Sequence, residues 1–232
     1  SPGLIEGPTR NSELDSFQLG LNPWHRGPTR RCVSHDKGRC NLVEFFRNCF
    51  SEITERLNDA DTSDLVAATD LIRGILTSGG KIIVVGNGGS AAIASHLTVD
   101  LTKAAGIRTV NFNEPTLLTC FANDYGYEHW VEKALDYHAD KGDLLILISS
   151  SGESANIANG ARRAKALGLS ILTLSGFASD NRLRSLGCVN LWVNSHTYNI
   201  VENVHQIWML SIVDYLVADN VKGAGNPPED TD

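Results

Sequence analysis

Two spacings of apolar residues follow one another along the chain. Over residues 42–57 the apolar side chains recur every three or four positions, which predicts an amphipathic helix of about four turns. The polar cluster at residues 61–64 predicts the start of a second helix, whose apolar stripe continues to Ile75 before two glycines end it. The aromatic first helix suits a subunit interface as well as the core of one chain.

Beyond residue 80, short apolar runs, the first of them β-branched, alternate with helical spacings. Strands are predicted at residues 81–85, 108–112, 143–149, 170–174 and 189–193. Helices are predicted at residues 90–104, 115–123, 128–140, 155–167, 180–186 and 199–217. The alternation predicts an α/β fold, a three-layer doubly wound sandwich in which helices cover both faces of a five-stranded parallel sheet and two helices precede it. Ligands then bind at the carboxyl ends of the strands.

Length and composition set the domain organisation. The chain has 232 residues, of which 42% are hydrophobic and 20% charged, enough for one α/β domain with an appended element. Residues 1–40 combine proline, glycine and mixed charge without a period. We expect a flexible extension there, with a partner-binding arm near residues 21–24 as the alternative. Residues 41–220 are expected to form one domain that includes the first two helices, and residues 221–232 a disordered acidic tail.

Charge and cysteine content exclude several classes of protein. The net charge is −7 and no segment is dense in Lys or Arg, which argues against nucleic acid as a partner. Five scattered cysteines without a CxxC pair are typical of a reducing compartment. The longest apolar run, residues 207–217, contains Asp214 and is too short to span a bilayer, and the first residues lack the apolar core of a signal peptide. We therefore expect a cytoplasmic protein without a membrane partner.

A glycine-rich turn follows the first predicted strand. Residues 86–90 read Gly-Asn-Gly-Gly-Ser and lead into a helix of small residues, so backbone N–H groups at the helix start can receive an anion. His96 and Asp100 lie four positions apart on one face of this helix. The pattern predicts acid–base or metal chemistry on a phosphorylated small molecule, although such turns also serve packing alone in α/β folds.

A serine-rich turn follows the third predicted strand. Ser149, Ser150, Ser151 and Ser154 surround Gly152, and their hydroxyls can donate to phosphate oxygens while the glycine lets the backbone approach. Capping of the following helix is the alternative for any one of these serines. Neither turn contains Gly-Lys-Ser/Thr, so the sequence predicts no nucleotide triphosphate site.

Five motifs together resemble the sugar isomerase (SIS) domain family, and within it the phosphoheptose isomerases. They are residues 86–90, His96 with an acidic residue four positions later, and residues 121–126, 149–156 and 201–205. Their order and spacing agree with the family over residues 42–219. The resemblance implies a flavodoxin-like SIS fold, a homotetramer, and the conversion of sedoheptulose 7-phosphate to D-glycero-D-manno-heptose 7-phosphate through an enediol.

The resemblance also assigns roles by position. It makes Asp100 the base and His205 the general acid. The positions that match substrate contacts are Asn87, Gly88, Ser90, Asn123, Asp124, Ser149, Ser150, Ser151, Ser154 and Glu202. Several of these isomerases bind zinc, and the candidate ligands here are His96, Asp100, Glu202 and His205. No nucleotide or nicotinamide cofactor is implied, because only protons move.

Two positions depart from the family pattern. Asp100 stands where the isomerases have glutamate, which shortens the side chain by roughly 1.5 Å, and Glu202 stands where they have glutamine. A misplacement of about 1 Å can cost about a hundredfold in rate. We hypothesise that Asp100, Glu202 and His205 form the acid–base or metal constellation. For His205, which has Ile207 and Met209 as neighbours, a buried core histidine is the alternative.

Two classes of function fit these observations. The first is a phosphosugar aldose–ketose isomerase. The second is a non-catalytic SIS protein, either a phosphosugar sensor or a protein-binding tetramer. The two histidines and the acidic pair favour catalysis, whereas aspartate at position 100 weakens that interpretation.

Overall fold

The computed structural model describes residues 42–223, with side chains for residues 42–220. The extension expected at residues 1–40 and the tail residues 224–232 lie outside the described residues. The elements are α1 (Leu42–Asn58), α2 (Thr62–Ser78), β1 (Ile82–Gly86), α3 (Gly89–Lys103), β2 (Thr109–Asn111), α4 (Pro115–Tyr125), α5 (Trp130–His138), β3 (Leu144–Ser149), α6 (Ala155–Leu167), β4 (Ser170–Ser175), β5 (Val189–Trp192) and α7 (Tyr198–Gly223). α7 thus continues three residues into the segment expected as a tail.

The five strands form one parallel sheet in the order β2-β1-β3-β4-β5. In its register, Ile82 of β1 pairs with Thr109 of β2 on one side and with Leu144 of β3 on the other. The chain reverses its direction of winding between β1 and β3. The loops that follow these two strands therefore diverge and leave the crevice in which open α/β sheets bind ligands.

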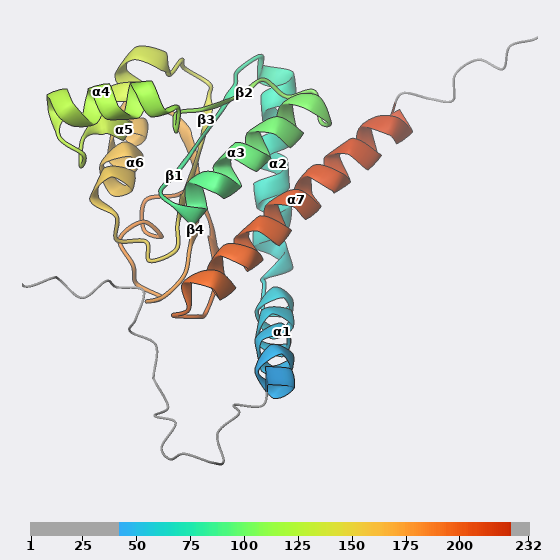
Figure 1. Cartoon of the computed structure of the whole chain (residues 1–232). Coiled ribbons are helices and arrows are strands. Elements are labelled where there is room, and N and C mark those ends of the chain that lie inside the picture. The colour runs from blue at the N-terminus through green and yellow to red at the C-terminus, as the bar shows by residue number, and fades with distance from the viewer. Residues whose placement is uncertain (1–41, 224–232) are drawn as a thin grey trace, which may run out of the picture. The chain divides into compact units, whose positions relative to one another are not determined.

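Helices cover both faces of the sheet, which confirms the predicted three-layer sandwich. Figure 1 shows α2, α3 and α7 on one side of the strands and α4, α5 and α6 on the other. Ile82 and Ile146 belong to the core on the first side, whereas Ile83 and Leu145 belong to the core that contains Trp130 of α5. The same two strands supply both cores because successive side chains of a strand point to opposite faces.

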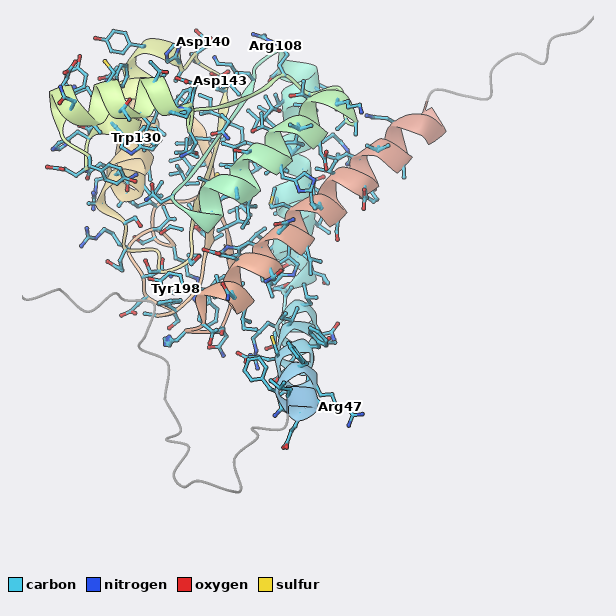
Figure 2. The ribbon with its side chains drawn as sticks, in the orientation of Figure 1. Arg47, Arg108, Trp130, Asp140, Asp143 and Tyr198 are labelled. Atoms are coloured by element: carbon cyan, nitrogen blue, oxygen red, sulfur yellow. The ribbon has the colours of Figure 1, made fainter. Side chains whose placement is uncertain are left out.

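An ion cluster lies at the amino ends of the strands. Lys81 Nζ donates to Asp140 Oδ2 and to Asp143 Oδ2, each at 2.6 Å, and the Asp143 side chain is almost fully buried. Figure 2 places Asp140 and Asp143 together at the end of the view opposite to Tyr198, where α7 begins. This cluster is therefore at the edge of the sheet away from the ligand-binding crevice.

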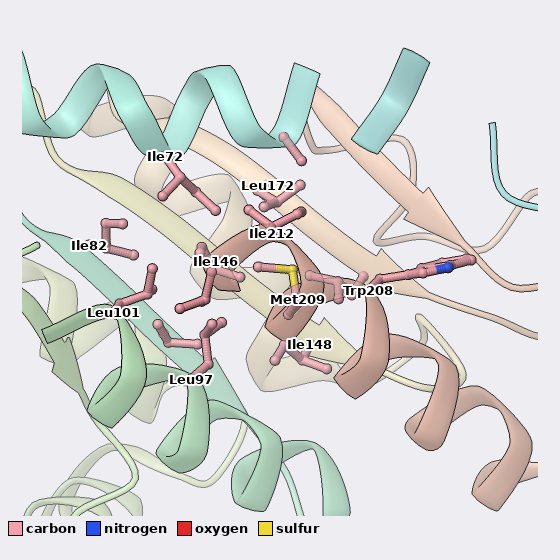
Figure 3. Close-up of a cluster of buried hydrophobic side chains, with 14 of the residues drawn as sticks. Ile72, Ile82, Leu97, Leu101, Ile146, Ile148, Leu172, Trp208, Met209 and Ile212 are labelled. Carbon is pink, nitrogen blue, oxygen red and sulfur yellow. The ribbon is translucent and has the colours of Figure 1, made fainter. Parts of the chain in front are cut away.

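The packing of α7 fixes which of its residues face α3. In Figure 3, Met209 and Ile212 of α7 enter the core between Ile72 of α2 and Leu97 of α3. Each such buried side chain contributes about 1.5–3 kcal/mol to stability relative to an exposed one. Rotation of α7 about its axis would expose this stripe, so the helix holds its polar residues in one orientation beside α3.

One predicted helix does not form. Residues 180–186 are in turns, where the Asn181 amide donates to the carbonyl oxygens of Gly176 and Ala178. Such side-chain bonds to the local backbone compete with the hydrogen bonds of a helix. The segment instead supports the turn after β3, since the Leu183 N–H donates to the Gly152 carbonyl at 3.0 Å.

No helix among residues 42–223 combines the length and the apolar character needed to cross a membrane.

Candidate functional site

Two loops meet at the crevice between β1 and β3, and we name them the glycine loop (residues 86–90) and the serine loop (residues 149–154). Asn156 lies in the first turn of α6, directly after the serine loop. The side-chain amides of Asn87 and Asn156 donate to each other's oxygens at 3.0 Å. The Tyr127 hydroxyl, from the connection between α4 and α5, also donates to Asn87 Oδ1 at 3.0 Å. Three separate segments of the chain therefore converge at the topological switch point.

The glycine loop brings backbone close to backbone. A Cβ on Gly86 would collide with the carbonyl group of Ser90, and Gly88 adopts a φ of 54°, where glycine is favoured. Ser90 is buried in the first turn of α3. Gly88 is the N-cap of α3 and supplies no side chain to cap it. The first N–H groups of α3 therefore need other acceptors.

The serine loop gathers hydroxyl groups at the end of β3. Ser149 Oγ donates to Ser154 Oγ at 3.3 Å, and Ser151 Oγ accepts from the Glu153 N–H at 3.3 Å. Ser154 is the N-cap of α6, yet its hydroxyl makes no capping hydrogen bond. Helix capping, the alternative role for these serines, therefore does not account for Ser154. The Ser149 hydroxyl, which donates to another hydroxyl, can turn to an incoming acceptor.

His96 and Asp100 contact each other on α3, as their spacing predicts. His96 Nε2 lies 3.2 Å from Asp100 Oδ2, and the Gln206 amide of α7 lies 3.4 Å from His96 Nδ1. With the Gln206 amide nitrogen as donor, Nδ1 is the acceptor and Nε2–H donates to Asp100. The His96 and Asp100 side chains are 47% and 36% exposed, so a ligand can reach the pair.

Glu202 lies on α7 one turn before Gln206 and faces both loops. Its Oε1 accepts from Ser150 Oγ at 3.3 Å, and a Cβ on Gly89 would collide with its carboxylate. Burial raises the pKa of Glu202, and the hydrogen bond from Ser150 only partly offsets that rise. The carboxylate therefore lies between the serine loop and the start of α3.

His205 does not face the crevice, which corrects the role of general acid that the resemblance implies. The residue is fully buried, its Nε2 lies 3.0 Å from the Ser175 carbonyl oxygen, and its Nδ1 has no partner among the described residues. Burial lowers its pKa to about 4, so the ring is neutral at physiological pH. The alternative, a core histidine, describes its surroundings beside Trp208.

Zinc does not fit the predicted ligand set within one chain. Among the described residues, no three His, Cys, Asp or Glu side chains are grouped so that they could hold a metal ion. His96 and Asp100 contact each other, but Glu202 faces Ser150 and His205 faces Ser175. We therefore derive no step through a metal.

Asn123 and Asp124, the predicted sugar contacts, lie on the exposed last turn of α4. The Asn123 amide donates to Asp124 Oδ1 at 2.9 Å. The chain leads from them to Tyr127, whose hydroxyl reaches the glycine loop. Their segment is thus joined to the glycine loop through Tyr127. Among the described residues, neither Asn123 nor Asp124 itself makes a side-chain hydrogen bond to either loop.

Three residues of the site are absent from the predicted set: Tyr127, Asn156 and Gln206. Asn156 belongs to the serine motif, and Tyr127 follows the motif at residues 121–126. Gln206 could have been found from its spacing, because it lies four positions after Glu202 and therefore on the same face of α7. Tyr127 had no such signal, since a tyrosine in a loop carries no periodicity.

Comparison with known proteins agrees with this architecture. The SIS domain profile matches residues 45–176. A phosphoheptose isomerase of Campylobacter concisus is 32% identical over 181 residues, which cover 74% of this chain and 91% of that protein. A phosphoheptose isomerase of Cytophaga hutchinsonii is 36% identical over 119 residues, or 49% of this chain and 62% of that protein.

Solved structures show the same fold. The structure of the phosphoheptose isomerase GmhA from Neisseria gonorrhoeae superposes with a TM-score of 0.70 at 25% identity, over 76% of this chain and 97% of that chain. A phosphoheptose isomerase from Francisella tularensis gives a TM-score of 0.69 at 22% identity, over 76% and 96% of the two chains. With a profile match over more than half of its length, this chain belongs to the SIS domain family.

Proposed function

We propose that this protein is a phosphosugar aldose–ketose isomerase that converts sedoheptulose 7-phosphate to D-glycero-D-manno-heptose 7-phosphate. The observation that carries the proposal is the position of the His96–Asp100 pair on the helix that begins at the crevice between the two loops. Relatives that bear the name phosphoheptose isomerase support this choice of substrate.

The crevice provides one place for the phosphate and another for the reacting carbons. In the proposed complex the serine loop donates to the phosphate oxygens, and the sugar extends along α3. Gly89 and His96 are seven positions apart in α3, about 10 Å along the helix axis. That span suits an extended seven-carbon sugar, so binding of the phosphate places C1 and C2 beside the His96–Asp100 pair.

Two steps, each with one proton lost and one proton gained by the sugar, complete the reaction. The Asp100 carboxylate takes a proton from C1 of the ketose while the oxygen on C2 gains a proton, which gives the enediol. Return of a proton to C2 and loss of the O1 hydroxyl proton give the aldose. His96, held by Asp100 through Nε2–H, uses Nδ1 to carry the proton from O1 to the oxygen on C2 once the sugar displaces the Gln206 amide. The reaction moves no hydride and no phosphoryl group, so it needs neither a nicotinamide nor a nucleotide.

The active form in this proposal is a homotetramer in the cytoplasm. α1 buries none of its residues, and Phe45, Phe46 and Phe50 on it are each more than half exposed. An apolar groove of about 540 Å³ lies beside it, between α2 and α7. Although Ile53 and Leu57 of α1 pack against the core, its phenylalanines stay exposed. One chain therefore carries both exposed aromatic side chains and an apolar groove, which a second copy could cover. Light scattering of the Phe46→Asp variant should then show smaller species than the unaltered protein.

Turnover in D2O tests the proposed reaction. The purified protein is incubated with sedoheptulose 7-phosphate, and mass spectrometry follows both the aldose product and deuterium bound to its carbon. We expect one deuterium at C2, because the proton that returns there exchanges with solvent. Absence of product and of deuterium at enzyme concentrations that reveal slow turnover would refute isomerase activity.

The burial of His205 favours a second candidate, a non-catalytic protein that binds a phosphosugar. His205, which the resemblance makes the general acid, is a core residue bonded to the Ser175 carbonyl and does not supply an acid to the crevice. The same incubation separates the two functions. A sensor would bind sedoheptulose 7-phosphate in calorimetry without product formation.

A further inference from the structure

Glu202 already accepts the hydrogen bond of one hydroxyl of the serine loop. Ser150 Oγ donates to Glu202 Oε1 at 3.3 Å, and Ser150 is only 4% exposed. A serine hydroxyl has a single proton to donate. A phosphate oxygen that takes this proton must therefore displace the carboxylate, which is a part of the protein itself.

The same carboxylate lies against the start of α3. A Cβ on Gly89 would collide with both Glu202 carboxylate oxygens, and no side chain caps this helix. The start of a helix favours negative charge because of its free N–H groups and its dipole. Glu202 thus places an internal negative charge where the glycine loop and α3 favour an external one.

The charge of Glu202 is not balanced by a neighbouring cation. Among the described side chains, none of the ion pairs includes Glu202. The residue is partly buried, and burial raises the pKa of its carboxyl group. A second anion in contact with Ser150 would therefore meet an unpaired carboxylate in surroundings that screen the repulsion less than bulk water does.

We propose that Glu202 is an internal competitor of the substrate phosphate, which holds Ser150 and the start of α3 in the free protein and so sets the phosphate affinity of the site. The inference rests on the proposed function only in taking the serine loop as the phosphate site. It makes Glu202 a residue that determines specificity through charge, without a part in proton transfer.

Binding of inorganic phosphate to the full chain tests this role, with isothermal titration calorimetry of the unaltered protein and of Glu202→Gln. The amide keeps the shape of the side chain and removes its charge. We expect the Kd for phosphate to fall at least about tenfold, since two like charges near a protein surface repel by several times the thermal energy. Asp214→Asn is the matched control, because it makes the same charge change at an exposed position of the same helix. Its Kd should stay within twofold of that of the unaltered protein.

Two further variants separate charge from shape. Glu202→Ala removes the carboxylate altogether and should also tighten phosphate binding, which covers the case in which Glu202→Gln fails to fold. Glu202→Asp keeps the charge near the crevice and should stay within about threefold of the unaltered protein.

An unchanged or weaker affinity in Glu202→Gln and Glu202→Ala, or no measurable phosphate binding by either, would overturn the proposal. Turnover of sedoheptulose 7-phosphate is measured on the same samples. Tighter phosphate binding without any turnover would refute the isomerase function and leave the role of Glu202 intact. Turnover without tighter phosphate binding in the variants would support the isomerase function and refute the role proposed for Glu202.

Discussion

Asn87 and Asn156 exchange two side-chain hydrogen bonds, each 3.0 Å long, across the crevice between β1 and β3. Asn156 is almost fully buried and comes from the first turn of α6, whereas Asn87 belongs to the glycine loop. The pair ties the two loops together at the carboxyl edge of the sheet. The relative position of any two groups held by the two loops therefore depends on it.

Asn156→Ala should loosen both the fold and the site. It removes both hydrogen bonds with the half-buried Asn87 side chain, each of which contributes about 0.5–1.5 kcal/mol net. We expect urea unfolding to show a loss of that size and the KM for sedoheptulose 7-phosphate to rise several-fold. Asn159→Ala, one turn further along α6, removes a bond to the Glu128 carbonyl and is the control. Equal KM values in the two variants would contradict a special role for Asn156.

Asp100→Asn should separate proton transfer from binding. The amide keeps the contact with His96 but cannot accept a proton from carbon, and loss of a general base typically costs 10²–10⁴-fold in rate, so we expect kcat to fall at least about a hundredfold. The Kd for inorganic phosphate should not change, because Asp100 lies about three helical turns from Gly89. Steady-state kinetics and calorimetry on the same preparation measure the two quantities. A fall in phosphate affinity with kcat retained would show that Asp100 is a binding residue.

Lys81→Met should destabilise the protein without altering the site. The change leaves the buried Asp143 carboxylate without its cation, although the Lys81 and Asp140 N–H groups still donate to it. Removal of one partner of a buried ion pair costs about 3–5 kcal/mol. Urea unfolding measures the loss, and the double variant Lys81→Met with Asp143→Asn should recover part of it. The kcat of the folded fraction should stay the same, since the cluster lies at the amino edge of the sheet.

The fold could be predicted from the sequence because its signals are local and repeated. The runs of β1 and β3 are short, apolar and buried at every position, and helical spacings flank them, which is typical of parallel strands covered on both faces. The segment 180–186 shows the limit of such signals. Its apolar spacing is helical, yet the Asn181 side chain bonds to nearby carbonyls and holds the chain in turns.

The site was predictable only as far as contacts follow from spacing along one helix. His96 and Asp100 meet because they are four positions apart, and Glu202 and Gln206 share a face of α7 for the same reason. His205 also lies one turn after Glu202, yet it is buried with Val201, Val204 and Trp208 and bonds to Ser175, which spacing along the helix does not reveal. The contact of Tyr127 with Asn87 joins residues 40 positions apart and leaves no trace in either local pattern.

The buried position of His205 predicts acid-sensitive stability. Its pKa falls to about 4 in the folded protein, whereas an unfolded histidine titrates near its ordinary value of 6.5. Between these values the unfolded chain binds more protons than the folded protein. The contribution of the neutral His205 ring to the free energy of unfolding is therefore fully present above about pH 6.5 and is lost as the pH falls toward 4. The two pKa values differ by about 2.5, so the loss is on the order of 3 kcal/mol. Urea unfolding at several pH values between 4 and 7 measures it.

Variants can assign this pH dependence to His205. His205→Leu cannot gain a proton on unfolding, so its stability should fall less steeply than that of the unaltered protein, although the Ser175 carbonyl loses its donor and the fold is weaker at every pH. His138→Gln is the control, because His138 is exposed and the change should leave the slope as it is. Parallel stability curves for His205→Leu and the unaltered protein would show that the ring is protonated in the folded state as readily as in the unfolded one, contrary to its burial.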